Sequence, residues 1–250
     1  MQRYFVPESG WTDSKVVLRD DDAHHISNVM RMTAEDQIIC NHPKGRAALC
    51  QIEDVSPEEV SARILDWLNE HKEMPVKVTI AQALPKGDKL DLIVQKGTEL
   101  GAHAFIPFKG DRSIVKWDQK KADKKIRRLE KIAKEAGEQS HRTSIPSIHH
   151  MKSFKELLLA ADQFDHLIVA SEVEAKKESP TLLGNIISTI QPDEHVLIVV
   201  GPEGGFSQQE LEQLMKENFY FTRFGPRILR TETAPLYFLS VMSYQFEELR

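Results

Sequence analysis

Apolar residues recur along the chain with two different patterns, which separate a short N-terminal part from a longer C-terminal part. Residues 1–70 contain short strand-like runs, and "QIICNHPKGRAALCQIEDV" predicts a hairpin that turns at Pro43, Lys44 and Gly45. A short helix is expected over "AHHISNVMRM", between these strands. We therefore expect a small β-rich domain over residues 1–72.

Strands and helices are expected to alternate after the polar segment "NEHKEM" and Pro75. The runs "VKVTIAQAL", "HAFIPF", "HLIVA" and "VLIVV" are nearly all apolar, as in strands that are buried on both faces of a sheet. Helices are expected over "KLDLIVQKGTEL", "SQQELEQLMKEN" and "ETAPLYFLSVMSYQFEEL". This alternation predicts an α/β domain with a mostly parallel sheet over residues 73–250.

One of the expected helices, "KWDQKKADKKIRRLEKIAKEAGEQSHR", carries much of the basic charge. Its apolar residues are spaced by three and four, as in an amphipathic helix: Ile126, Leu129, Ile132, Ala133 and Ala136. Residues 109–134 hold 11 Lys+Arg against 4 Asp+Glu, whereas residues 1–72 hold 8 against 13. Such a face is usually just solvated, but contact with a phosphate backbone is the alternative.

Composition limits the class of protein. The 250 residues are 40% apolar and 28% charged, which is enough to bury a core. The net charge of -5 argues against binding of nucleic acid over the whole surface. No leader-like or membrane-length apolar segment occurs, so we expect a cytoplasmic protein without membrane contact. Cys40 and Cys50 form neither a disulfide framework nor a zinc set, so buried reduced thiols and no metal are expected.

The stretch "VLIVVGPEGGFSQQE" leads from an expected buried strand into a helix, the position where open parallel sheets bind ligands. Gly201, Gly204 and Gly205 allow a tight turn and close approach of the backbone to a ligand, although three glycines can also make a plain turn. Ser207 and Glu210 predict a capping box at the start of the helix. Neither dinucleotide nor Walker-type phosphate motif is present, which favours a ligand without phosphate.

The second loop, "FGPRILRTETAP" at residues 224–235, contains more charged chemistry. Thr231 or Thr233 is expected to cap the last helix, and Pro235 suits its first turn. Arg227 and Arg230 flank an apolar pair at a strand end, where two guanidinium groups are costly unless they meet anions. The alternative is a pair of surface arginines beside Glu232.

These motifs together carry a resemblance. "GPEGGFS" and "GPRILRTETAP", preceded by "QKGTELG" and by "RS" at 112 and 113, resemble the SPOUT superfamily of S-adenosylmethionine-dependent RNA methyltransferases, and within it the RsmE family. "MQRYFV", "HHISNVMRM" and "EAGEQSHR" extend the resemblance over essentially the whole chain. Two positions depart from the pattern: Phe224, where Leu is usual, and Glu35, where Gly often precedes Asp36. Both are expected at packing or turn positions.

The resemblance implies a fold and an activity. It implies a small PUA-like β-barrel that binds RNA, over residues 1–72, and a catalytic SPOUT domain over residues 73–250 with a parallel sheet and a trefoil knot. It also implies a homodimer that methylates N3 of a uridine in 16S ribosomal RNA, with the assembled 30S subunit as the expected substrate.

The resemblance also implies roles for particular residues. The two glycine-marked loops would bind S-adenosylmethionine, through Val200, Gly201, Glu203, Gly204, Gly205, Phe224, Gly225, Ile228, Leu229, Thr231 and Pro235. From the chemistry of methyl transfer, we hypothesise that Arg230 stabilises the uridine anion and that Glu232 orients Arg230 or accepts the proton. Glu99, Glu172 and His141 are weaker candidates for proton transfer. The residues expected to contact RNA are Arg3, Arg31, Lys86, Arg112, Gln139 and Arg142.

Two other classes of function stay open from the sequence. The chain could be a ribosome-assembly factor that binds RNA and the methyl donor without turnover. It could also be a metabolic enzyme that uses the glycine loop for a nucleotide, although the missing phosphate motifs and the basic helix argue against this class.

Overall fold

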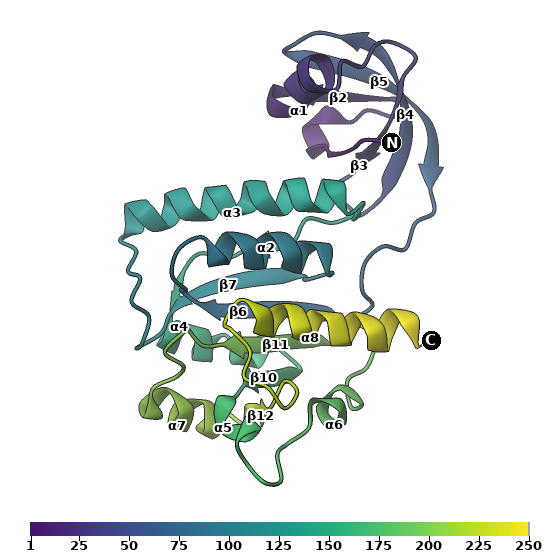
Figure 1. Ribbon diagram of the computed structural model, residues 1–250. Helices are drawn as coiled ribbons and strands as arrows, with labels where there is room; N and C mark the ends of the chain where they lie inside the picture. Colours follow the sequence, from purple (N-terminus) through teal and green to yellow (C-terminus); the bar gives the residue numbers. More distant parts are fainter. Residues whose placement is uncertain (250) are drawn as a thin grey trace. The chain divides into compact units, whose positions relative to one another are not determined.

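The chain divides into two compact units in the computed structural model, which describes residues 1–249 (Figure 1). The first unit comprises Met1–Glu73 together with Lys134–Ile145, and the second comprises the rest of the described chain. The sequence placed the boundary after residue 72 and assigned everything beyond it to the C-terminal domain. The segment 134–145 therefore lies in a different unit from the one expected.

A curled five-stranded sheet forms the first unit. Its strands, in the order β1-β3-β4-β5-β2, are Arg3–Phe5, Gln37–Asn41, Ala47–Val55, Glu59–Leu68 and Lys15–Arg19. Only β1 and β3 are parallel, and β3 and β4 form the predicted hairpin. The pairing of β4 with β5 shifts register twice, and such irregularities bend a sheet. The result is a half-barrel rather than a barrel, because the end strands β1 and β2 do not pair with each other within the described residues.

Alternating side chains of the half-barrel form a small apolar core. Helix α1 (Asp20–His24) and the π-helical turn His25–Val29 cover it with Ala23 and Ile26, close to the helix expected from the sequence. Cys40 and Cys50 are fully buried in this core as free thiols, as the sequence predicted.

The segment 134–145 is tied to the first unit by hydrogen bonds and ion pairs. The side-chain amide of Asn41 donates to the carbonyl of Arg142 at 2.8 Å, and the Arg142 guanidinium is bound by the carboxylate of Glu73. Lys134 lies 2.6 Å from the carboxylate of Asp22. These partners are separated by about 70 to 110 positions in the sequence, so no local pattern could have revealed them.

A seven-stranded sheet, in which every pair of strands is parallel, forms the second unit. Its order is β12-β10-β11-β6-β7-β8, and β9 also pairs with β7. The strands, in chain order, are Lys77–Ala83 (β6), Ala104–Lys109 (β7), Ser147–Ile148 (β8), Lys152–Ser153 (β9), His166–Ala170 (β10), His195–Val200 (β11) and Tyr220–Thr222 (β12). The predicted parallel α/β domain is thus confirmed.

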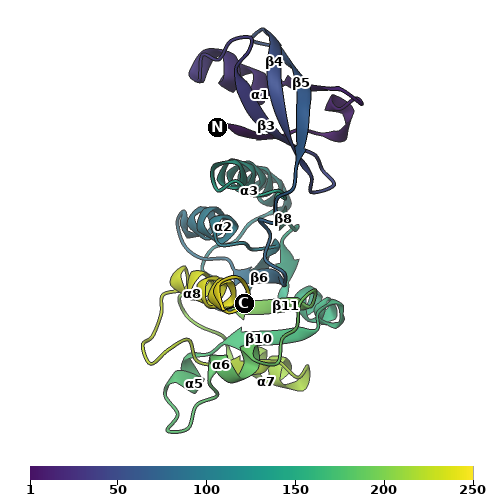
Figure 2. The same ribbon diagram turned by 90° about the vertical axis from the view of Figure 1, so that its right-hand side faces the viewer.

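Helices cover both faces of this sheet, which explains the continuous apolar runs in its strands. Along β11, Val196, Ile198 and Val200 pack in one core cluster, and Leu197 and Val199 pack in the other. The first cluster includes residues of α2 (Lys89–Glu99), α3 (Gln119–Gln139), α6 (Leu183–Ile187) and α8 (Thr233–Ser243). The second includes residues of α4 (Phe154–Leu159) and α7 (Gln208–Lys216). Figure 2 shows α2 and α8 on one side of β6 and β11.

Helix α3 matches the predicted basic amphipathic helix, with Ile126 and Leu129 buried. No helix within residues 1–249 is both long and apolar enough to cross a bilayer.

Candidate active site

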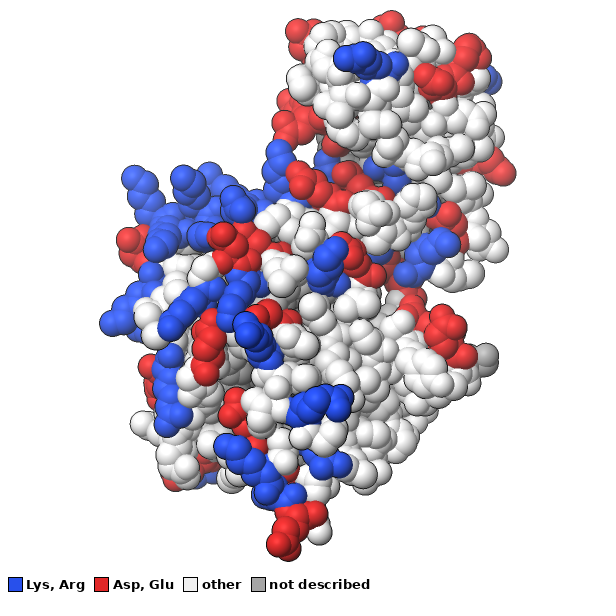
Figure 3. All heavy atoms as spheres, viewed as in Figure 1, with Lys and Arg blue, Asp and Glu red and all other residues white. Residues whose placement is uncertain are grey.

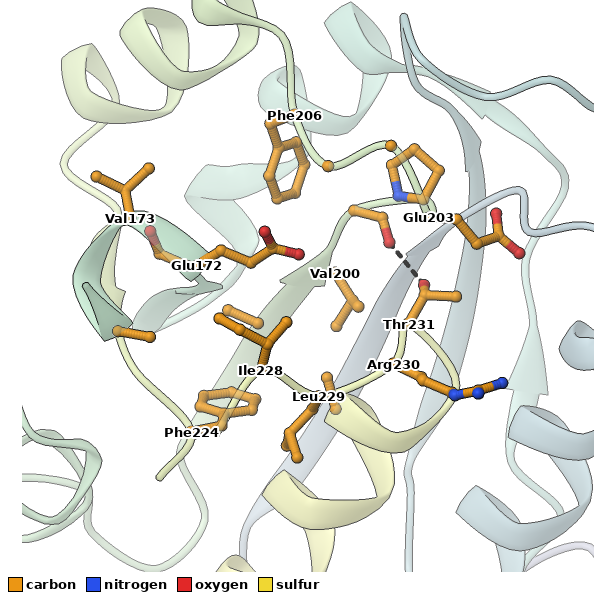
Figure 4. A pocket seen from close by; sticks show the side chains of 18 of the residues that line it. Glu172, Val173, Val200, Glu203, Phe206, Phe224, Ile228, Leu229, Arg230 and Thr231 are labelled. Carbon is orange, nitrogen blue, oxygen red and sulfur yellow. Dashed lines mark hydrogen bonds between the residues drawn. The ribbon is translucent and has the colours of Figure 1, made fainter. Parts of the chain in front are cut away.

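Loops at the carboxyl ends of three neighbouring strands surround a cavity of about 490 Å³ (Figure 4). They follow β10, β11 and β12, the position where open parallel sheets bind ligands. The loop after β10 includes the one-turn helix α5 (Glu172–Ala175), whose start is capped by the Ser171 hydroxyl. Lys89 at the start of α2 and Arg112 in the segment after β7 also line the cavity.

The floor of the cavity is apolar and its rim is charged. Val200 and Phe224 are buried at the floor and Leu229 is partly buried, while Ile228 lines the cavity with more than half of its surface exposed. Figure 4 shows Glu172 on one side of these side chains and Arg230 on the other. The ring of Phe224 stacks on those of Tyr237 and Phe238, with centroids 5.9 and 5.7 Å apart, which fixes its position. The basic side chains of Lys176, Arg227 and Arg230 are exposed. A ligand in this cavity therefore meets apolar surface inside and positive charge at the mouth.

Thr231, in the loop after β12, connects this loop to the glycine loop after β11. Its buried hydroxyl donates to the carbonyl of Gly201 at 2.7 Å and accepts from the side-chain amide of Gln82 at 2.9 Å. Since buried polar groups without partners are costly, this pair of bonds holds the two loops in one arrangement. Gln82 lies near the end of β6, so the central strand of the sheet supports both loops.

The shape of the loop after β11 favours glycine at three positions, through backbone conformation at one and close packing at the other two. Gly205 has φ +65°, a conformation that residues with a Cβ rarely adopt. A Cβ on Gly201 would lie 3.2 Å from the ring of Phe206, and a Cβ on Gly204 would lie 3.2 Å from the Cβ of Arg112. The Arg112 guanidinium also donates to the Gly204 carbonyl at 3.0 Å. The loop is therefore tightly packed before any ligand is considered.

Lys89 joins two carboxylates at one side of the cavity. Its ammonium lies 2.9 Å from Glu203 Oε1 and 3.0 Å from Glu232 Oε2, and these carboxylates raise the pKa of Lys89. Burial raises the pKa of Glu203 and of Glu232, but hydrogen bonds and the nearby cations outweigh it and hold both pKa values below the usual range. Both carboxylates are thus ionised at neutral pH, and Glu232 is paired with Lys89 rather than with Arg230.

The start of α7 carries the predicted capping box. The Ser207 hydroxyl accepts from the backbone N–H of Glu210, and the Glu210 carboxylate accepts from the backbone N–H of Ser207. The same carboxylate accepts from the backbone N–H of Asp111 at 2.9 Å. Glu210 therefore joins the glycine loop to the loop after β7.

Nine of the eleven residues predicted to bind the donor line the cavity; Gly225 and Pro235 do not. Gly225 has φ +73° and forms a turn in the loop after β12, while Pro235 is buried in the first turn of α8. The predicted threonine cap of α8 is wrong. Glu232 occupies the cap position without a side-chain bond, and the backbone N–H groups of Thr233 and Ala234 donate to the Arg230 carbonyl instead.

The residues predicted to contact RNA differ in their surroundings. Arg3 is buried and bonded to Asn41 and to Glu70, and Arg142 is buried against Glu73, so these two guanidinium groups have structural partners in the first unit. Exposed positions are found for Arg31, Lys86, Arg112 and Gln139.

The weaker candidates for proton transfer are also placed. Glu172 lines the cavity. Arg227, which the sequence offered as a second anion-binding arginine, lines it too. Glu99 forms an ion pair with Lys96 at 2.8 Å, and His141 is an exposed residue with φ +59°.

The sequence did not reveal that the loop after β10 lines the cavity. Ser171 and Val173 follow β10, and the strand "HLIVA" followed by a capping serine was the available signal. Lys89 was missed because its two partners lie 114 and 143 positions further along the chain. A lysine in the first turn of a helix gives no local sign of such partners.

Comparisons with known proteins agree with this geometry. A sequence profile of the RNA methyltransferase domain matches residues 72–243, and a profile of the RNA methyltransferase PUA domain matches residues 18–65. Over all of its length, the chain is 49% identical to ribosomal RNA small subunit methyltransferase E of Bacillus subtilis, of which it covers 99%. The chain belongs to the RsmE family.

RsmE structures resemble the whole chain as well. The S-adenosylmethionine-bound ribosomal RNA small subunit methyltransferase E of Neisseria gonorrhoeae is 30% identical with a TM-score of 0.87, and all of both chains is covered. A methyltransferase of Legionella pneumophila, solved with S-adenosylmethionine, is 27% identical with a TM-score of 0.85 and 97% coverage of both chains. The half-barrel is thus a PUA domain, and the parallel-sheet unit is a methyltransferase domain of the RsmE type.

Proposed function

We propose that this protein methylates a uridine at N3 in small-subunit ribosomal RNA, using S-adenosylmethionine, and that it reads the assembled small subunit. The observation that carries the proposal is the three-loop cavity at the carboxyl ends of β10, β11 and β12, in a chain of the RsmE family. An apolar floor with a basic rim suits a small donor inside and an RNA chain outside.

The cavity fits the proposed donor. Its volume of about 490 Å³ lies in the range of about 300–1,000 Å³ that is usual for ligand and cofactor sites. Val200, Phe224 and Leu229 offer apolar surface to the adenine, and the Glu172 carboxylate offers an acceptor for hydroxyl or ammonium groups. No phosphate motif is needed, because S-adenosylmethionine supplies a methyl group from a sulfonium cation and carries no phosphate.

The chain's own contribution to the reaction is to orient the uridine and to stabilise its anion. The imide N3 of uridine is a poor nucleophile until it loses its proton, so cations beside the cavity favour the reactive form. Arg230 lines the cavity and supplies such charge, whereas the charge of Lys89 is balanced by the ionised carboxylates of Glu203 and Glu232. Arg230 is the catalytic residue of this proposal, because it is exposed at the mouth where the RNA enters.

Glu232 acts mainly as a positioning residue. Its pKa is held below the usual range, which makes it a weak base, and its carboxylate holds Lys89 in place. The alternative that Glu232 accepts the N3 proton predicts a rate that depends on its titration. The proposal predicts instead that Glu232→Gln weakens catalysis no more than Lys89→Met does.

The experiment is transfer of a labelled methyl group from S-adenosylmethionine to small ribosomal subunits that lack the modification, with naked ribosomal RNA beside them. Digestion and chromatography then identify the product nucleoside. We expect label in N3-methyluridine, and more of it from subunits than from naked RNA. Label in another nucleoside contradicts the assigned base position, and donor binding without any transfer supports the assembly-factor alternative.

The proposal includes a homodimer. The large apolar side chains of Val173, in the loop after β10, and of Tyr244, after α8, are each more than half exposed. A second copy of the chain would cover such surface. Light scattering at micromolar concentration is expected to give twice the chain mass of 28.6 kDa, and a single-chain mass contradicts this part of the proposal.

A further inference from the structure

A second cavity, of about 190 Å³, lies in the C-terminal unit beside the turn that follows β6. It is lined by that turn, by the first residues of α2, by the segment before α3 and by one face of α3. Lys89 and Leu90 are neighbours in the first turn of α2, yet Lys89 lines the large cavity and Leu90 lines the small one. The backbone N–H of Lys86, in the same turn, donates to Glu203 of the large cavity at 3.1 Å. One short segment therefore borders both cavities.

The walls of the small cavity combine an aromatic ring, a carboxylate and two ammonium groups. Trp117 is partly buried and packs against the main core of this unit, so its ring is held in place. Lys121 and Lys125 are four residues apart on α3 and share one face of the helix. Asp91 Oδ2 lies 2.8 Å from the Arg128 guanidinium, and this carboxylate is mostly buried.

This chemistry matches an unpaired nucleobase better than a phosphate. The Asp91 carboxylate is paired with Arg128 through Oδ2 and can also accept a hydrogen bond from an N–H group of a base, which a phosphate does not offer. An indole ring offers a stacking surface that any base can use. The lysines at the mouth suit the phosphate of the same nucleotide. A nucleotide bound here would have its base inside the cavity and its phosphate outside.

The surrounding surface provides the complementary charge for a nucleic acid strand. Figure 3 shows Lys and Arg side chains gathered over the start of α3. Exposed basic residues there include Lys116, Lys120, Lys124 and Arg127. A surface of this kind attracts a phosphate backbone without regard to sequence, whereas the small cavity adds a place for one base.

We propose that the small cavity holds an unpaired base of the substrate RNA, in the neighbourhood of the nucleotide that enters the large cavity. This inference rests on the proposed function, because it takes RNA as the substrate. It adds a second base-binding site that is separate from the donor site and is built by Trp117, Asp91, Lys121 and Lys125.

Two double variants test the lysines at equal charge. Lys121→Gln with Lys125→Gln changes the cavity, and Lys120→Gln with Lys124→Gln removes the same charge from the same helix outside the cavity. Binding to labelled small-subunit ribosomal RNA is measured by filter retention, and KM for small subunits is measured by methyl transfer. We expect the first pair to raise both the Kd for RNA and the KM for small subunits at least fivefold more than the second pair does. Equal effects of the two pairs would overturn the proposal.

Two single variants test the aromatic ring. Trp117→Leu keeps apolar volume against the core but removes the stacking surface, while Trp117→Phe keeps a smaller ring. Because loss of a stacked base costs about fivefold or more in affinity, we expect Trp117→Leu to raise the Kd for RNA at least fivefold and Trp117→Phe less than threefold. Donor affinity and the melting temperature serve as folding controls. RNA affinity that stays within twofold in a folded Trp117→Leu protein would contradict the proposal.

The binding readout separates this inference from the proposed function. If the wild-type protein binds the RNA but transfers no methyl group, the proposed activity fails while the variants still test the cavity. If transfer proceeds and the four variants all behave alike, the second base site fails and the activity stands.

Discussion

Arg230 is the residue on which the proposed chemistry depends most. It lies at the mouth of the large cavity, and its guanidinium can stabilise the negative charge that develops on the uridine ring. We expect Arg230→Ala to lower the rate of methyl transfer at saturating donor at least tenfold, equivalent to about 1.4 kcal/mol of transition-state stabilisation. Single-turnover rates measure this, and Arg227→Ala is the matched control at the same rim. A loss below tenfold contradicts the catalytic role.

Glu35 is a second residue whose effect can be predicted, because its backbone is in the left-handed region at φ +75°. Its carboxylate accepts from the side-chain amide of Gln51 at 2.6 Å, and both Glu35→Gly and Glu35→Ala remove this contact. Only glycine removes the strain of the left-handed backbone conformation. We expect the glycine variant to be more stable than the alanine variant by about 1 kcal/mol, measured by urea unfolding. Equal stabilities would show that the turn is not strained.

At the residue scale, the sequence showed which loops matter but not their partners. The glycines of the loop after β11 were identified by their residue type, whereas the donor-binding role of Ile228 and Leu229, which line the cavity, came from the family resemblance. The bonds of Thr231 to Gln82 and of Lys89 to Glu203 join residues more than 110 positions apart, so they depend on the folded arrangement.

Helix α2 illustrates how an element is fixed on the sheet. A Cβ on Gly97 would lie 2.8 Å from the fully buried ring of Phe105, whereas a Cβ on Gly184 in α6 would meet nothing within 4 Å. We expect Gly97→Ala to destabilise the protein by about 1–3 kcal/mol through overpacking. Gly184→Ala is expected to be neutral or to stabilise by about 0.4–1 kcal/mol. Thermal unfolding compares the two, and similar melting temperatures would contradict this packing.

The last turns of α3 carry a carboxylate that makes stability depend on pH. Burial raises the pKa of Glu138 to about 7, and the neighbouring Asp22 adds to the effect against the opposing charge of Lys134 and the hydrogen bond from the Phe5 backbone. Between about pH 4.5 and 7, the folded state thus holds a proton that the unfolded state has lost. This contribution to stability is present below the unfolded pKa near 4.5 and is lost as the pH rises through about 7.

The sign of this effect gives a test on the same element. Glu138→Gln keeps an acceptor for the Phe5 N–H and cannot ionise, so we expect it to stabilise the protein by on the order of 1–2 kcal/mol at pH 8 and by little at pH 5. Urea midpoints at the two pH values measure the difference. A variant that is destabilised equally at both would show that Glu138 is ionised and well paired in the folded protein.

At the scale of elements, the sequence predicted the long strands, α2, α3, α7 and α8, because their periodicity is strong. The two-residue strands β8 and β9 and the short helices α4 and α6 were not predicted, since two to six residues give no period to detect. The trefoil knot implied by the resemblance stays a prediction, because threading leaves no trace in a local pattern.

The two units of the whole molecule have different charge and different chemistry. The half-barrel carries excess acidic residues, while the basic residues gather on α3 and at the rim of the large cavity. This distribution explains how a chain with a net charge of -5 can have a surface suited to a phosphate backbone. It also predicts RNA affinity that falls steeply with salt concentration.

The proposed activity depends most on whether the three loops bind S-adenosylmethionine. Calorimetric titration of the donor into the wild-type protein, into Ile228→Lys and into Ile114→Lys tests it most directly. Both isoleucines are more than half exposed, but only Ile228 lines the cavity. A lysine there would replace apolar surface with a charge that repels the sulfonium. We expect micromolar binding that weakens at least fivefold in Ile228→Lys and changes less than twofold in Ile114→Lys. Equal affinity in all three proteins would place the donor outside this cavity and contradict the account.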